Sequence, residues 1–149
     1  MRSLCWTVVA AVWFPAAAAA QQDNPFTALA RTTFEREQAT GRARGFEPLG
    51  DSRTGLLLLR ERDSIRLHLE GGWEYLAVGI CDEDCRDLYF YLLDQQDKQI
   101  AVDVWRQAHP RLQLKVESTA NYTLAVAMGS CSVEPCYYSV QLFRKALAP

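Results

Sequence analysis

The chain has 149 residues, and 49% of them are hydrophobic. This length and hydrophobic content are enough for one domain with a sizeable core, and the formal charge is −2 at pH 7. This slightly acidic balance argues against nucleic-acid binding, which needs a basic surface to displace counterions from phosphates. It also gives no electrostatic reason to expect an anionic membrane surface as a partner.

Residues 1–20 have the three parts of a secretory signal peptide. Arg2 is the positive n-region, residues 4–14 are the apolar h-region, and three alanines at 18–20 precede Gln21. The apolar run is too short for a spanning helix, and no later segment is apolar for long enough. We therefore predict cleavage after Ala20 and a periplasmic or extracellular mature protein. An uncleaved N-terminal anchor is the alternative.

A helix is predicted within residues 21–45. Asn24 can cap it and Pro25 suits its first position, where the missing N–H costs nothing. Its apolar residues fall at helical spacing on one face: Phe26, Leu29, Ala30 and Phe34. We expect this face to pack on the rest of the domain; the alternative is that it waits for a partner.

Residues 46–149 read as short strands separated by polar turns about every ten residues. A short apolar run at 56–60 comes first, and polar–apolar alternation follows at 64–70, 88–92, 112–116 and 138–142. Two further apolar runs, at 73–81 and 122–128, each lead into a pair of cysteines. The pattern predicts an all-β fold: an antiparallel β-sandwich or jelly roll of about eight strands, preceded by one helix.

Four cysteines remain after the leader, which in an exported chain indicates disulfides. We favour the local pairs Cys81–Cys85 and Cys131–Cys136, because each pair flanks its own turn. The two crossed connectivities stay open. A four-thiolate zinc site is a further alternative, since three and four residues separate the paired cysteines.

The residue order from Tyr75 to Tyr137 resembles the bacterial pre-peptidase C-terminal (PPC) domain, in a variant with two cysteine loops. The similarity covers residues 64–143. It rests on Tyr75, Gly79, Cys81, Asp82, Asp84, Cys85, Asp87, Leu88, Leu93, Asp94, Asp103, Pro110, Tyr122, Met128, Cys131, Pro135, Cys136 and Tyr137. The resemblance implies a secreted jelly-roll module that accompanies exported hydrolases and serves secretion or substrate adhesion. Tyr89 replaces the family's second Asp, which weakens the case for a metal there.

The acidic residues around the first cysteine loop are candidate calcium ligands, because calcium takes six to eight oxygen ligands. The candidates are Asp82, Asp84, Asp87 and Asp103. The alternative is a solvated acidic loop without an ion.

Three tyrosines are candidate binding residues, because strand alternation turns them away from the apolar side: Tyr89, Tyr91 and Tyr137. Exposed tyrosines on a sheet face are good anchors for sugars or protein. The alternative is that they pack against Phe26 or Phe34 of the helix.

No catalytic motif stands out. His68 and His109 lack metal-pair spacing, and the chain has no phosphate-binding glycine loop or nucleophile elbow. We predict a non-catalytic exported module that binds or stabilises an envelope or extracellular partner, a protein or a polysaccharide. The alternatives are a small envelope hydrolase or hydrolase inhibitor, and a calcium-stabilised structural domain.

Overall fold

The computed structural model describes residues 24–148, so the predicted signal peptide lies outside the described residues. One helix, α1 (Pro25–Arg42), precedes eight strands. They are β1 (Glu47–Leu57), β2 (Arg62–Leu69), β3 (Trp73–Cys81), β4 (Cys85–Leu93), β5 (Gln99–Asp103), β6 (Arg111–Val116), β7 (Ala120–Cys131) and β8 (Cys136–Ala146). The predicted all-β sandwich with one N-terminal helix is confirmed. Within residues 24–148, no helix has the length and apolarity needed to cross a membrane.

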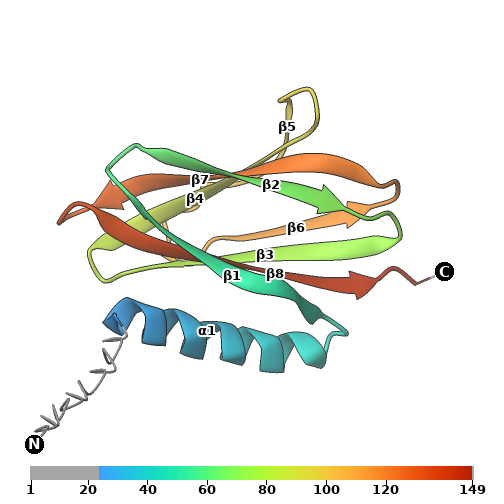
Figure 1. The fold of residues 1–149 in the computed structure, drawn as a ribbon, viewed down its shortest axis with the longest axis horizontal. Coiled ribbons are helices and arrows are strands. Elements are labelled where there is room, and N and C mark those ends of the chain that lie inside the picture. Colours follow the sequence, from blue (N-terminus) through green and yellow to red (C-terminus); the bar gives the residue numbers. More distant parts are fainter. Residues whose placement is uncertain (1–23, 149) are drawn as a thin grey trace, which may run out of the picture.

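The strands form two four-stranded sheets, and every pairing is antiparallel. The first sheet has the order β1-β8-β3-β6 and the second the order β2-β7-β4-β5 (Figure 1). Strand β1 pairs with β8, β2 with β7, β3 with β6 and β4 with β5. The chain is thus a long antiparallel ribbon that has been rolled into two layers, which is the jelly-roll arrangement.

The outer face of the first sheet is covered by α1, which lies along it in Figure 1. The helix begins where predicted: the side chain of Asn24 accepts a hydrogen bond from the backbone N–H of Phe26 at 3.0 Å. An apolar cluster joins the helix to the sheet. It contains Phe26, Ala30 and Phe34 from the helix, together with Phe46, Leu76, Val78, Ile80 and Phe143. The prediction that the helix packs on the domain is therefore confirmed, except that Leu29 is 48% exposed.

Because α1 covers the centre of the first sheet, strand β3 is buried on both faces. Every residue of β3 after Trp73 is buried, although alternate side chains point to opposite sides. Strand β4, a central strand of the second sheet, instead alternates between buried and half-buried residues from Asp87 to Leu93. The two sheets therefore differ: one is enclosed between the core and a helix, and the other has an outer face that α1 does not touch.

The buried side chain of Tyr138 on β8 joins the two sheets at one end of the core. Its hydroxyl donates a hydrogen bond to Oδ2 of Asp63 on β2, and Arg53 on β1 donates to the same oxygen at 3.0 Å. Gly55 makes room for the ring, because a Cβ at this position would lie 2.6 Å from it.

The apolar run predicted as a strand at 56–60 is wrong in its boundaries. Strand β1 ends at Leu57, and Leu58 and Leu59 lie 50% and 41% exposed in the turn that follows. Arg60 has φ 67°, a turn conformation that no regular strand contains. The periodicity identified the apolar residues but not the turn that carries half of them.

Candidate binding face

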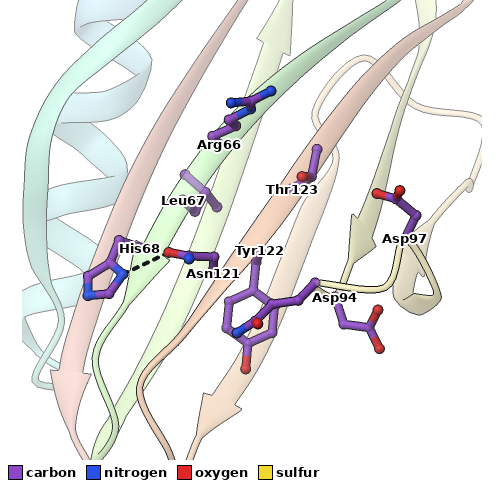
Figure 2. Close-up of a pocket in the computed structure, with 9 residues that line it drawn as sticks. Arg66, Leu67, His68, Asp94, Asp97, Asn121, Tyr122 and Thr123 are labelled. Atoms are coloured by element: carbon purple, nitrogen blue, oxygen red, sulfur yellow. Dashed lines mark hydrogen bonds between the residues drawn. The ribbon is translucent and has the colours of Figure 1, made fainter.

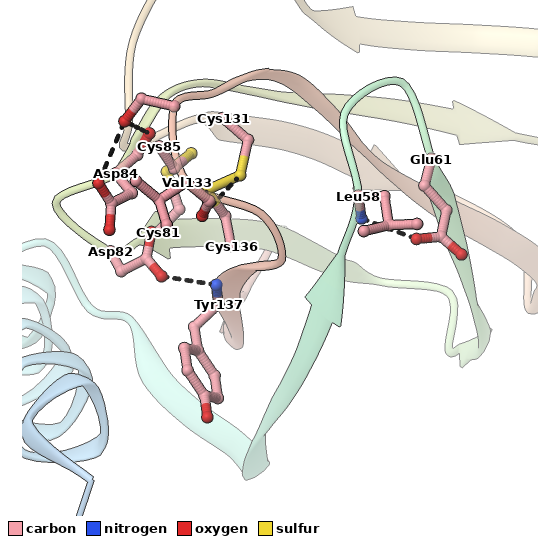
Figure 3. Close-up of a disulfide and its surroundings, with 11 residues drawn as sticks. Leu58, Glu61, Cys81, Asp82, Asp84, Cys85, Cys131, Val133, Cys136 and Tyr137 are labelled. Carbon is pink, nitrogen blue, oxygen red and sulfur yellow. Dashed lines mark hydrogen bonds between the residues drawn. A yellow bond between two sulfur atoms is a disulfide. The ribbon is translucent and has the colours of Figure 1, made fainter.

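The four cysteines form two local disulfides, Cys81–Cys85 and Cys131–Cys136, with sequence separations of 4 and 5 (Figure 3). The favoured pairing is confirmed and the zinc alternative is wrong, because all four sulfur atoms are in disulfide bonds. Each bond closes the turn between two consecutive strands. The disulfides therefore hold two loops at one end of the sandwich.

Two of the candidate calcium ligands connect these loops to each other. Oδ2 of Asp82 accepts a hydrogen bond from the backbone N–H of Tyr137 at 2.7 Å, and Oδ1 of Asp84 accepts from the hydroxyl of Ser132 at 3.1 Å (Figure 3). The other oxygen of Asp82 is buried without a hydrogen-bond partner among residues 24–148. These carboxylates brace one cysteine loop against the other.

The other two candidates lie elsewhere. Asp103 is 6% exposed and accepts hydrogen bonds from the backbone of Trp105 and Arg111 and from the side chain of Gln107. Asp87 lies on β4 opposite Ser130. In the part of the chain that the structure describes, no group of three or more His, Cys, Asp or Glu side chains could hold a metal ion. The calcium alternative therefore gains no support, and Asp103 organises the β5–β6 loop instead.

The three candidate tyrosines do not share a surface. Tyr137 lies on the outer side of the first sheet, where its ring stacks on Phe26 of α1 with centroids 5.5 Å apart and planes at 25°. Tyr89 and Tyr91 lie on β4, on the outer face of the second sheet, opposite Ala127 and Ala125. The helix-packing alternative thus applies to Tyr137, whereas the other two remain candidates for binding.

We call the outer face of the second sheet the open face. Its central strand β7 carries the small residues Ala125, Ala127 and Gly129 on this side. The larger side chains of Tyr89, Tyr91 and Arg62 lie over them. The ring of Tyr89 lies so close above Gly129 that a Cβ there would meet it at 2.5 Å. The guanidinium of Arg62 reaches from β2 across β7 to Tyr91, 5.0 Å from the ring centroid. Ala125 and Ala127 are 6% and 5% exposed beneath these groups, so the open face presents a layer of tyrosine and arginine.

Strand β5 adds an aliphatic border to the open face. Ile100, Val102 and Val104 are 41–45% exposed, and Trp105, which follows directly, is 79% exposed. Sequence reasoning did not single out any of these four residues. Spacing by two from Ile100 to Val104 was the available signal, since it places three β-branched residues opposite the side that carries Asp103. Three hydrogen bonds to Asp103 tie the backbone of the loop that carries this exposed indole.

A polar hollow of about 590 Å³ opens at the other end of the same face (Figure 2). It lies between the exposed residues of β2 and β7 and the β4–β5 turn, and its polar lining is Arg66, His68, Asp94, Gln95, Asp97, Asn121 and Thr123. Nδ1 of His68 and Oδ1 of Asn121 are 2.8 Å apart. Oδ1 of Asp94 accepts hydrogen bonds from the backbone of Gln96 and Lys98, which shapes the turn.

The shifted pKa values at two other places have structural causes. Burial, followed by the hydrogen bond to Asp63, raises the pKa of Tyr138 to about 12, and the same bond lowers the pKa of Asp63. The hydrogen-bonded Lys145 ammonium, 2.9 Å away, lowers the pKa of Glu74, a 5% exposed residue on the covered side of the first sheet. The Tyr138–Asp63 hydrogen bond and the Lys145–Glu74 ion pair each tie two strands together.

No protein-family model matches the chain, and no curated protein is similar enough to count as a match. The resemblance to the PPC domain therefore stays a prediction. The observation that the structure adds is the asymmetry of the sandwich: a covered outer face on one side and the open face on the other.

Proposed function

We propose that the protein is a non-catalytic binding module whose ligand surface is the open face. The export predicted from the leader and the resemblance to the PPC domain support a partner in the cell envelope or outside the cell. The observation that carries the proposal is the difference between the two outer faces, because α1 covers one and the other keeps exposed aromatic and aliphatic side chains.

The residue types of the open face are those that dominate binding energy at interfaces. Tyrosine, tryptophan and arginine are enriched among such residues because they combine large apolar area with a polar end. Here Tyr89, Tyr91 and Arg62 are already held in place before a ligand arrives, by Gly129 and by the contact of Arg62 with Tyr91. A pre-ordered surface loses less side-chain entropy on binding.

The hydrolase alternative has less support from the geometry. A glycoside hydrolase needs two carboxyl groups that flank a bond, one of them as a proton donor. Of the two carboxylates in the polar hollow, Asp94 is engaged by two backbone N–H groups that shape its own turn. We therefore assign the hollow to binding.

Photocrosslinking in the host cell tests the proposal. A benzophenone side chain would be placed at Val102 on the open face and, as a matched control, at Leu29 on the opposite side; these residues are 43% and 48% exposed. We expect a discrete adduct from Val102 that disappears when Arg62→Ala is added, and none from Leu29. Absence of an adduct at Val102, or equal adducts at both positions, contradicts the proposal.

A further inference from the structure

We infer that the open face binds a neutral polysaccharide. Sugar rings would lie against its aromatic part, by which we mean Tyr89, Tyr91 and Trp105, and sugar hydroxyls would lie in the polar hollow. The inference rests on the proposed function and names its ligand class. Four observations lead to it: the continuity of the face, the hydrogen-bonding groups of the hollow, the position of Asp97 and the presence of charges of both signs.

The aromatic part and the hollow belong to one continuous surface. Along β7, Thr123 pairs with Arg66 of β2 and Leu93 of β4, and Ala127 pairs with Arg62 and Tyr89. These two rows are four residues apart, or about 14 Å at the rise of an antiparallel strand. A ligand that contacts both must therefore be extended, so a polymer fits the surface better than a single small molecule.

The polar hollow offers both donors and acceptors, as a sugar hydroxyl requires. The amide oxygen of Asn121 can only accept, so Nδ1 of His68 donates the 2.8 Å bond between them. This bond fixes the amide and leaves its NH₂ group to donate to a ligand. Asp94 keeps its second oxygen, Oδ2, as an acceptor, since the two backbone bonds fall on Oδ1.

Asp97 occupies a turn position that a glycine would fit with less strain. Its φ is 59°, in the left-handed region, where a residue with a side chain is less stable than glycine. Figure 2 shows its carboxylate at the rim of the hollow, on the turn that faces β7. Aspartate is one of the residues that tolerate this conformation in turns, and the turn places its carboxylate as an acceptor beside the hollow.

The open face carries charges of both signs. Arg62 and Arg66 lie on β2, and Asp94 and Asp97 lie on the β4–β5 turn on the other side of β7. A polyanion would meet the two carboxylates and a polycation the two guanidinium groups. An uncharged ligand with many hydroxyl groups meets no such repulsion, and it can use the charged groups as strong hydrogen-bond partners.

Affinity electrophoresis of residues 21–149 through gels containing soluble polysaccharides tests the inference. The probes are xyloglucan, glucomannan, mixed-linkage β-glucan and amylose as neutral polymers, and polygalacturonate as an acidic one. We expect retardation by at least one neutral polymer and none by polygalacturonate. Trp105→Ala and Asn121→Ala should each weaken the affinity about tenfold, and Leu29→Ala should not change it. Thermal midpoints of all variants check that the fold persists.

Each contrary result has its own meaning. Failure of all four neutral polymers to retard the protein overturns the polysaccharide inference, and retardation by polygalacturonate alone overturns the neutral ligand. Unchanged affinity in both Trp105→Ala and Asn121→Ala places the site elsewhere. If the neutral polymers fail while Val102 still forms a crosslink to a protein, the binding function stands and only its ligand class is wrong.

Discussion

Replacing Tyr138 with phenylalanine isolates the hydrogen bond that joins the two sheets. The ring is 1% exposed and remains in place, so the substitution removes only the hydroxyl that donates to Asp63. A hydrogen bond to a charged group contributes about 1.5–3 kcal/mol. The Asp63 side chain is 32% exposed and keeps Arg53, so water can replace the lost donor in part. We therefore expect a loss near the lower limit, about 1.5 kcal/mol.

Urea denaturation measures this loss, and the thermal midpoint should fall by roughly 4–7 °C for a domain of this size. The loss should also depend on pH. The folded pKa of Asp63 is lowered, so its contribution is present above the unfolded value of about 3.9 and is lost as pH falls through the folded pKa. The folded pKa of Tyr138 is raised to about 12, so its contribution is present below about 10 and lost above it.

The difference in the free energy of unfolding between the unsubstituted protein and Tyr138→Phe should thus be greatest between about pH 5 and 9, and it should shrink on either side. Tyr137→Phe is the matched control: the neighbouring ring stacks on Phe26, and its hydroxyl makes no hydrogen bond within residues 24–148. An unchanged stability of Tyr138→Phe at pH 7, or a loss that stays the same at pH 3, would refute the charge-assisted bond.

Three further substitutions test the packing. Phe34→Ala removes a 7% exposed ring from the buried face of α1 and should cost about 3–5 kcal/mol in urea denaturation. Leu29→Ala, on the exposed side of the same helix, should change stability by less than about 0.5 kcal/mol. Similar losses for both would mean that the helix does not pack as described. Gly55→Ala would bring a Cβ to 2.6 Å from the buried tyrosine ring, and the calorimetric midpoint should fall by an amount equivalent to about 1–3 kcal/mol; an unchanged midpoint would contradict this. Lys145→Met removes the ammonium that is paired with Glu74, a 5% exposed residue, and should cost about 2–4 kcal/mol at pH 7. The loss should be smaller at pH 4, and a loss that does not depend on pH would show that packing, not charge, is responsible.

Local patterns in the sequence predicted the elements better than their assembly. Strand β3 has the predicted bounds, and the capping residue Asn24 marks the helix start. Both depend on neighbours in the chain. The order of strands in each sheet depends on pairings between distant segments, such as Glu47 with Arg144, which no local period encodes.

The same limit explains why the candidate binding and metal residues were grouped wrongly. Alternation correctly turned Tyr89, Tyr91 and Tyr137 outward, but it could not tell which sheet each strand would join. It therefore merged a tyrosine that packs on the helix with two on the open face. Asp103 was grouped with the acids of the cysteine loop because it is acidic, whereas its burial and three donors became visible only in the folded loop.

The rolled-ribbon pairing has a consequence for when the protein can fold. In the two sheets that residues 24–148 form, the edge strand β1 pairs only with β8 and the edge strand β2 only with β7, and β7 and β8 are the last two strands of the chain. A nascent chain that ends before Ala120 holds the β3–β6 and β4–β5 pairs, but it has no partner for β1 or β2. Such dependence on distant contacts slows folding, because loop closure must come before any pairing is rewarded. Strands β1 and β2 therefore stay without partners until residues 120–146 are free. For the export predicted from the leader, this delay favours the unfolded state that a translocation channel requires.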